Sequence, residues 1–128
     1  HSQDALTLVT HDSPDTREVY PFNFEFRVRF TLDANTMHVS FITTNTGAKP
    51  LYYAPGAHEA YACPEGIEAY DVVFAKAEPL IRTVLDGNYF ERKTEPVDAD
   101  GVLAHKEGIL TLQPGKTQTF THHISILA

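Results

Sequence analysis

The residue of this chain best suited to acid–base chemistry is His58, which lies in the run YYAPGAHEAY at residues 52–61. It follows a predicted β-strand. We expect this strand to end in a turn at Pro55 and Gly56, because proline lacks an amide hydrogen and glycine admits positive φ. Loops at the ends of rigid strands often carry functional groups, and imidazole exchanges protons near neutral pH. His58 is therefore a candidate general acid. The alternative is a structural histidine that is hydrogen-bonded within its loop.

Other chemistries have less support in the sequence. His122 and His123 are adjacent in a predicted strand, so their side chains should point to opposite faces and not share one ion. No His-Glu-x-x-His helix is present, and we expect neither a metal nor a cofactor. Cys63, the only cysteine, precedes Pro64, and we expect it to behave as a small inert hydrophobe. The remaining histidines are expected to lie on the surface or in turns without a chemical role: His1, His11, His38 and His105.

The composition narrows the class of partner. Of the 128 residues, 42% are hydrophobic, which is enough for one domain with a core. The formal charge of −7 argues against a nucleic-acid or anionic-membrane partner, because phosphate binding needs clustered Lys and Arg. There is no apolar run long enough to span a bilayer, and the polar start HSQD does not resemble a signal peptide. We expect a cytoplasmic protein.

A periodicity of two indicates β-strands through most of the chain. In residues 20–32, one stripe of apolar side chains alternates with polar ones, as in a half-buried strand. Residues 20–32, 37–45 and 51–54 are predicted to form consecutive antiparallel strands of one meander, with turns at 32–36 and 45–50. The residues expected to share the buried side of the first strand are Phe22, Phe24, Phe26, Val28 and Phe30.

Further strands are predicted at residues 70–74, 80–85, 89–93, 109–112 and 117–127. Turns are predicted at 86–88 and 113–116, and a polar loop at 94–106. We find no convincing helical periodicity, so the chain is expected to form an all-β structure. Alternating strands alone would equally suit an immunoglobulin-like interaction module.

Three segments, in this order, carry a resemblance to a known family. They are residues 16–24 (TREVYPFNF), 45–50 (NTGAKP) and 56–58 (GAH). Together they resemble the aldose 1-epimerase (galactose mutarotase) family, and the LacX-like branch in particular. Residues 106–109 (KEGI) and 112–115 (LQPG) are similar to the closing strands of that family.

The resemblance implies an antiparallel β-supersandwich of galactose mutarotase type that binds a small-molecule hexose in a cleft. Residues 1–128 would form part of one such domain, with a discontinuity near 101–106. His58 matches the acid that protonates the ring oxygen of the sugar. The glutamate that acts as base has no counterpart here, since Glu95 lies in a different context. Family members are considerably longer, so the chain is either a piece of a larger protein or a natural remnant.

Two functions follow from this resemblance. The first is an isomerase that interconverts the α and β anomers of a hexose by acid–base ring opening. The second is a non-catalytic carbohydrate-binding or structural β-sandwich. Neither the sugar nor the oligomeric state follows from the sequence. A chain that lacks part of the domain should expose an unpaired sheet edge or an apolar patch, and such surfaces favour association.

Overall fold

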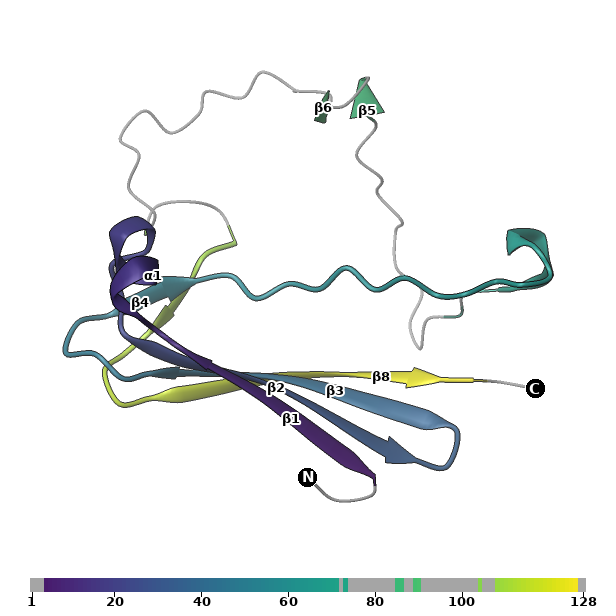
Figure 1. The fold of residues 1–128 in the computed structure, drawn as a ribbon, viewed down its shortest axis with the longest axis horizontal. Coiled ribbons are helices and arrows are strands. Elements are labelled where there is room, and N and C mark those ends of the chain that lie inside the picture. The colour runs from purple at the N-terminus through teal and green to yellow at the C-terminus, as the bar shows by residue number, and fades with distance from the viewer. Residues whose placement is uncertain are drawn as a thin grey trace. The chain divides into compact units, whose positions relative to one another are not determined.

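The computed structural model describes residues 4–71, 73, 85–86, 89–90, 104 and 108–126 (Figure 1). The chain divides into two units. The first contains His1–Pro55 and Gly101–Ala128, and the second contains Gly56–Asp100. Each unit is described by itself.

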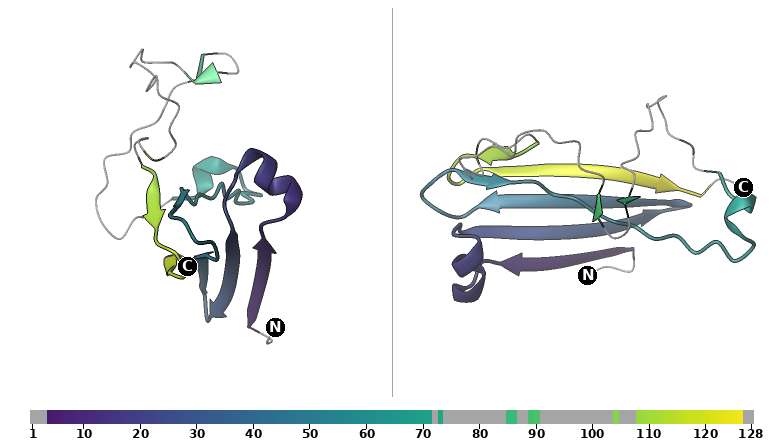
Figure 2. Two further views of the ribbon diagram at one scale, coloured as in Figure 1. Left: turned by 90° about the vertical axis from the view of Figure 1, so that its left-hand side faces the viewer. Right: turned by 90° about the horizontal axis from the view of Figure 1, so that it is seen from above.

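The first unit is built on a four-stranded antiparallel sheet. Its strands lie in the order β1 (Ala5–His11), β2 (Phe24–Asp33), β3 (Thr36–Asn45) and β8 (Thr117–Ser125), as the right-hand view of Figure 2 shows. Two shorter strands, β4 (Leu51–Tyr53) and β7 (Leu110–Leu112), pair in a separate two-stranded sheet. The mostly antiparallel β-structure confirms the predicted fold class.

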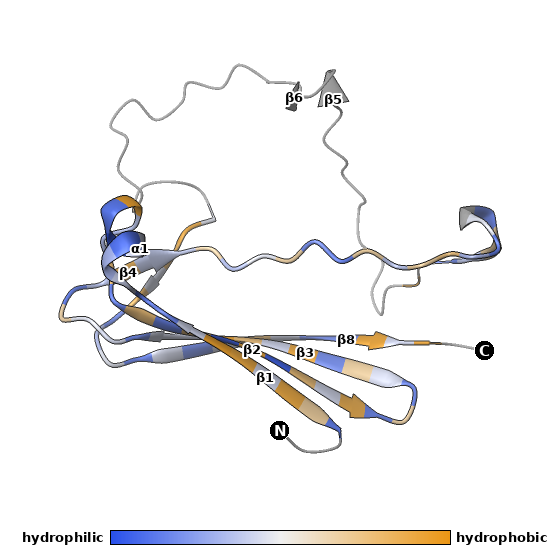
Figure 3. Cartoon of the chain, in the orientation of Figure 1, coloured by the Kyte–Doolittle hydropathy of each residue, from blue (hydrophilic) through white to orange (hydrophobic). Residues whose placement is uncertain are grey.

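The alternation read from the sequence places one set of side chains on each face of the four-stranded sheet. Val28 lies across from Phe41, and Phe30 across from Val39, so these side chains share one face. Hydrophobic and hydrophilic residues alternate along the strands in Figure 3. We call this side the apolar face. Its apolar residues and His122 are Leu6 and Leu8 on β1; Phe24, Phe26, Val28, Phe30 and Leu32 on β2; Met37, Val39 and Phe41 on β3; and Phe120, His122 and Ile124 on β8. The expected half-buried stripe is therefore confirmed, except that Phe22 precedes the strand.

The hairpin between β2 and β3 closes over two residues. Asp33 pairs with Thr36, which leaves Ala34 and Asn35 as the loop, within the turn predicted at residues 32–36. Ala34 has φ of 50°, in the left-handed region that side chains other than glycine adopt at a cost.

The predicted three-stranded meander is wrong at its third strand. β2 and β3 pair as expected, but β4 pairs with β7, and the second neighbour of β3 is β8. The reason lies at the end of β3, where the Asn45 side chain binds the backbone of both the following turn and β7. These bonds take the chain out of the sheet after residue 45.

The described part of the first unit also contains two elements that the sequence analysis missed. Strand β1 precedes all the predicted strands. Residues 14–19, for which no element was predicted, form the helix α1 (Pro14–Val19). Ser13 and Thr16 form a reciprocal capping box, and Pro14 occupies the first turn. Six residues are too few to show a helical period, so the cap is the only local signal of this helix.

The second unit is described only in part. It contains a 3₁₀ helix at Ile67–Ala69 and the paired strands β5 (Leu85–Asp86) and β6 (Tyr89–Phe90). Tyr70, Asp71 and Val73 do not belong to a strand, so the strand predicted at 70–74 is wrong there. Several predictions fall outside the described residues. They are those for residues 80–84, 87–88 and 91–93, and those for the loop at 94–106 except residue 104.

Candidate functional site

The strand that leads to His58 is fixed at all three of its residues. Leu51 is 1% exposed and lies across from the buried Leu112. The Tyr20 hydroxyl donates to the Tyr52 carbonyl oxygen at 2.6 Å, and the Tyr53 hydroxyl donates to Gln118 Oε1 at 2.9 Å. β4 therefore has a defined position in the first unit.

Asn45, the first residue of the NTGAKP segment, organises the turn that precedes β4. It is 1% exposed, and its amide nitrogen donates to the carbonyl oxygens of Lys49 at 2.8 Å and Leu112 at 2.7 Å. Its Oδ1 accepts from the Gly47 N–H at 2.9 Å. A buried amide with both ends bonded to backbone sets the turn geometry, because each group left unpaired would cost free energy. The role of this motif residue is thus structural.

The YPF part of the TREVYPFNF segment packs its rings against β4. The rings of Tyr20 and Phe22 lie 4.8 Å apart between centroids, and Phe22 meets Tyr52 edge-on at 5.9 Å. Edge-to-face aromatic contacts add to the free energy gained from burial. Two of the three segments that carry the family resemblance therefore converge on the strand that precedes the third.

Two tyrosine hydroxyls of this region are held in the neutral form. Burial raises the pKa of Tyr20, and the charge of Tyr53 adds to the effect. Burial also raises the pKa of Tyr53, against the opposing hydrogen bond with Thr43. Both groups therefore remain hydrogen-bond donors well into the alkaline range.

Asp12 fixes the start of β2 relative to the end of β1. Its carboxylate accepts from the Phe24 N–H at 3.0 Å and from Asn23 Nδ2 at 2.8 Å, and it pairs with Arg17. Desolvation alone would raise the pKa of the Asp12 carboxyl, but these hydrogen bonds outweigh it and lower the pKa. The carboxylate is therefore a structural clamp between these segments.

His58 lies five residues after the end of β4, in the second unit, and it is exposed. The β4 ladder ends at Tyr53, as predicted for a strand that meets Pro55. The predicted turn at Pro55 and Gly56 is absent. Residues 54–63 carry no regular structure, and Gly56 has no positive φ. A Cβ added at Gly56 would meet no atom within 4 Å, so neither strain nor crowding requires glycine there.

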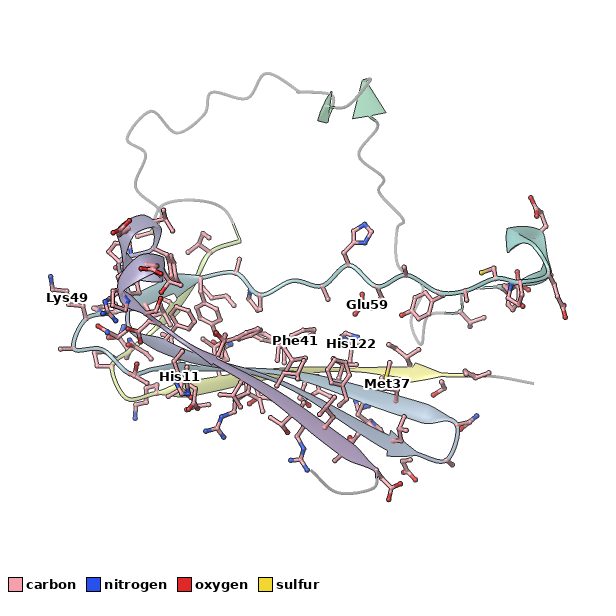
Figure 4. The ribbon with its side chains drawn as sticks, in the orientation of Figure 1. His11, Met37, Phe41, Lys49, Glu59 and His122 are labelled. Carbon is pink, nitrogen blue, oxygen red and sulfur yellow. The ribbon has the colours of Figure 1, made fainter. Side chains whose placement is uncertain are left out.

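The histidines of β3 and β8 lie on the faces that the strand period requires, and the predictions for His1 and His105 fall outside the described residues. His122 lies on the apolar face with Met37 and Phe41 (Figure 4), and its ring centroid is 5.6 Å from that of Phe41. His123 lies on the opposite face, which confirms that the two diverge. His38 was assigned to the surface or a turn, but it lies within β3 and contacts His123. Within the described part of the chain, no group of three or more His, Cys, Asp or Glu side chains could hold a metal ion.

With the strands and the motif segments placed, the chain can be compared with known proteins. The sequence model of the aldose 1-epimerase family matches residues 1–96, which is most of the chain. The chain belongs to the aldose 1-epimerase family. The matched region includes all three motif segments and His58.

Individual relatives agree with the assignment to the aldose 1-epimerase family. This chain is 29% identical over 82 residues to the plasmid-encoded and the chromosomal protein LacX of Lactococcus lactis subsp. lactis. The alignment covers 60% of this chain and 27% of each relative. The X-ray structure of a galactose mutarotase related enzyme from Lactobacillus acidophilus is similar in fold. It superposes with a TM-score of 0.63 at 18% identity, over 100% of this chain and 69% of that one.

The chain thus spans about a quarter of the length of the curated relatives that it matches. The structural match confirms the galactose mutarotase-like fold. In the described residues, no helix is long and apolar enough to cross a membrane.

Proposed function

We propose that the protein containing this chain interconverts the α and β anomers of a hexose. The observation that carries this proposal is the family match over residues 1–96, which includes His58 in its GAH segment. The family match and the likeness to a galactose mutarotase related enzyme support a small sugar as the substrate class.

His58 is assigned the role of general acid. Its imidazolium donates a proton to the ring oxygen as the C1–O bond breaks, while a base removes the proton of the anomeric hydroxyl. The open-chain aldehyde then rotates about C1–C2, and closure on either face returns both protons. Histidine suits this task because it can give and recover a proton near neutral pH. The base is assigned to no residue of this chain.

Mutarotation of freshly dissolved α-D-galactose or α-D-glucose, followed by polarimetry with the intact protein, tests the proposal. We expect His58→Asn to lower the rate by at least about a hundredfold with no loss of folding, because the side chain is exposed. His11→Asn is the matched control, since His11 is also exposed and lies at the end of β1. It should retain the full rate.

Full activity of His58→Asn would remove this residue from the mechanism. An intact protein that binds the sugar in calorimetry but does not accelerate its mutarotation would instead support a non-catalytic carbohydrate-binding β-sandwich.

A further inference from the structure

His38 and His123 face each other across β3 and β8 on the side of the sheet opposite the apolar face. They are register partners, and their Nδ1 atoms are in direct contact. The two rings meet edge-on with centroids 4.6 Å apart. His38 is half-buried and His123 exposed, so solvent and small ions reach the pair.

The backbone pattern explains why these side chains meet. Ile126 donates its amide N–H to the Asn35 carbonyl oxygen at 3.0 Å, so that pair is a hydrogen-bonded one. Hydrogen-bonded and non-hydrogen-bonded pairs alternate along antiparallel strands. Three positions further, His38 and His123 form a non-hydrogen-bonded pair, the type in which side chains come closest.

The neighbouring pairs of the same kind are hydroxyl pairs. Ser40 and Thr121 meet at 2.8 Å, and Thr36 and Ser125 also meet at 2.8 Å. The histidines therefore lie in a row of small polar groups that can bind water. Across β2, the register partner of His38 is the uncharged Thr31.

We propose that His38 and His123 form a two-histidine binding site for a divalent transition-metal ion, with Cu²⁺ bound most tightly. Two imidazole nitrogens that face each other either share one proton or, after a small rotation that separates the rings, direct both lone pairs at one ion. Imidazole is a preferred ligand of Cu²⁺, Ni²⁺ and Zn²⁺, and the Irving–Williams order places Cu²⁺ first. Water molecules would complete the coordination beside the hydroxyl pairs.

Such an ion would join β8 to β3. Among the described strands, β8 lies at the edge of the four-stranded sheet and pairs with β3 alone. Because the ion binds the paired strands better than the unfolded chain, it should raise the stability of the sheet. This inference does not depend on the proposed mutarotation, which uses no metal.

The decisive measurement is the electron paramagnetic resonance spectrum of the protein with one equivalent of Cu²⁺, in a mildly alkaline buffer because protons compete for the same nitrogens. We expect hyperfine coupling to two imidazole nitrogens. In parallel calorimetry, His38→Gln and His123→Gln should each bind Cu²⁺ about a hundredfold more weakly, since the second ligand acts at high effective concentration.

His122→Gln is the matched control. Its side chain is adjacent in sequence but lies on the other face, so the variant should bind as the unaltered protein does. The chain has seven histidines, so the difference between these proteins, and not the total binding, reports on the pair. An equal loss in His122→Gln would overturn the proposal. A one-nitrogen spectrum of the unaltered protein would do so as well, whether or not the variants fold.

Discussion

The amide nitrogen of Asn45 lies 2.7 Å from the carbonyl oxygen of Leu112, and both residues are buried. This bond joins the end of β3 to the end of β7. It is formed beside the pair of Leu51 and Leu112, where β4 and β7 meet. The NTGAKP segment thus connects the four-stranded sheet to the strand that precedes His58.

Replacement of Asn45 by alanine tests the importance of this bond. The change leaves the carbonyl oxygens of Leu112 and Lys49 and the Gly47 N–H without this partner, so we expect a loss of roughly 2–4 kcal/mol in the free energy of unfolding. Urea denaturation followed by circular dichroism measures it. Asn35→Ala is the control, because Asn35 is exposed and donates one hydrogen bond, to Ile126 O. A loss no larger than that of the control would contradict the role given to Asn45.

The turn residue Ala34 offers a stabilising substitution. The left-handed conformation costs a side-chain-bearing residue roughly 1–2 kcal/mol, whereas glycine gives back roughly 0.5–1 kcal/mol through the entropy of the unfolded chain. Ala34→Gly should therefore stabilise the protein by up to about 1 kcal/mol in the same denaturation assay. Ala54→Gly, at an exposed position without positive φ, should stabilise nothing. Equal effects of the two changes would argue against strain at Ala34.

Alkaline pH should weaken the contacts of Tyr20 and Tyr53. Because folding raises the pKa of both groups, their contribution to stability is complete below the unfolded value, about 10. It is lost as the pH rises through the higher folded values. We expect the urea concentration at the denaturation midpoint to be lower at about pH 11 than at about pH 8. This decrease should be smaller in Tyr20→Phe. The exposed Tyr61 serves as control, so Tyr61→Phe should keep the full dependence.

The apolar face leaves large side chains open to solvent, as expected of a chain that contains part of its family domain. Leu6 is 49% exposed, Leu8 55%, Leu32 60% and Phe120 39%. We expect a protein of these 128 residues to self-associate through this face. Sedimentation velocity should show Leu8→Lys shifted toward the monomer. Val9→Lys is the matched control, because Val9 is 50% exposed on the opposite face. If both variants shift equally, charge alone is responsible and the face is not the contact.

The local properties of the strands follow from the order of the residues along each strand. The alternation from Phe24 to Phe30 predicted which side chains share a face, and the adjacency of His122 and His123 predicted that these two diverge. Both follow from the period of two, which needs no knowledge of distant residues. The role of His58, which the GAH segment indicates by residue type and order, stays a prediction.

The identity of neighbouring strands, in contrast, depends on contacts between residues far apart in the chain. The pairing of β4 with β7 depends on Asn45 reaching Leu112, and the contact of His38 with His123 depends on β8 lying beside β3. Strand partners distant in sequence are selected by packing and by backbone hydrogen bonds, and no local pattern records them. The helix α1 was missed for a related reason. Its six residues are stabilised by the bonds between Ser13 and Thr16, and such a short segment has no periodicity to detect.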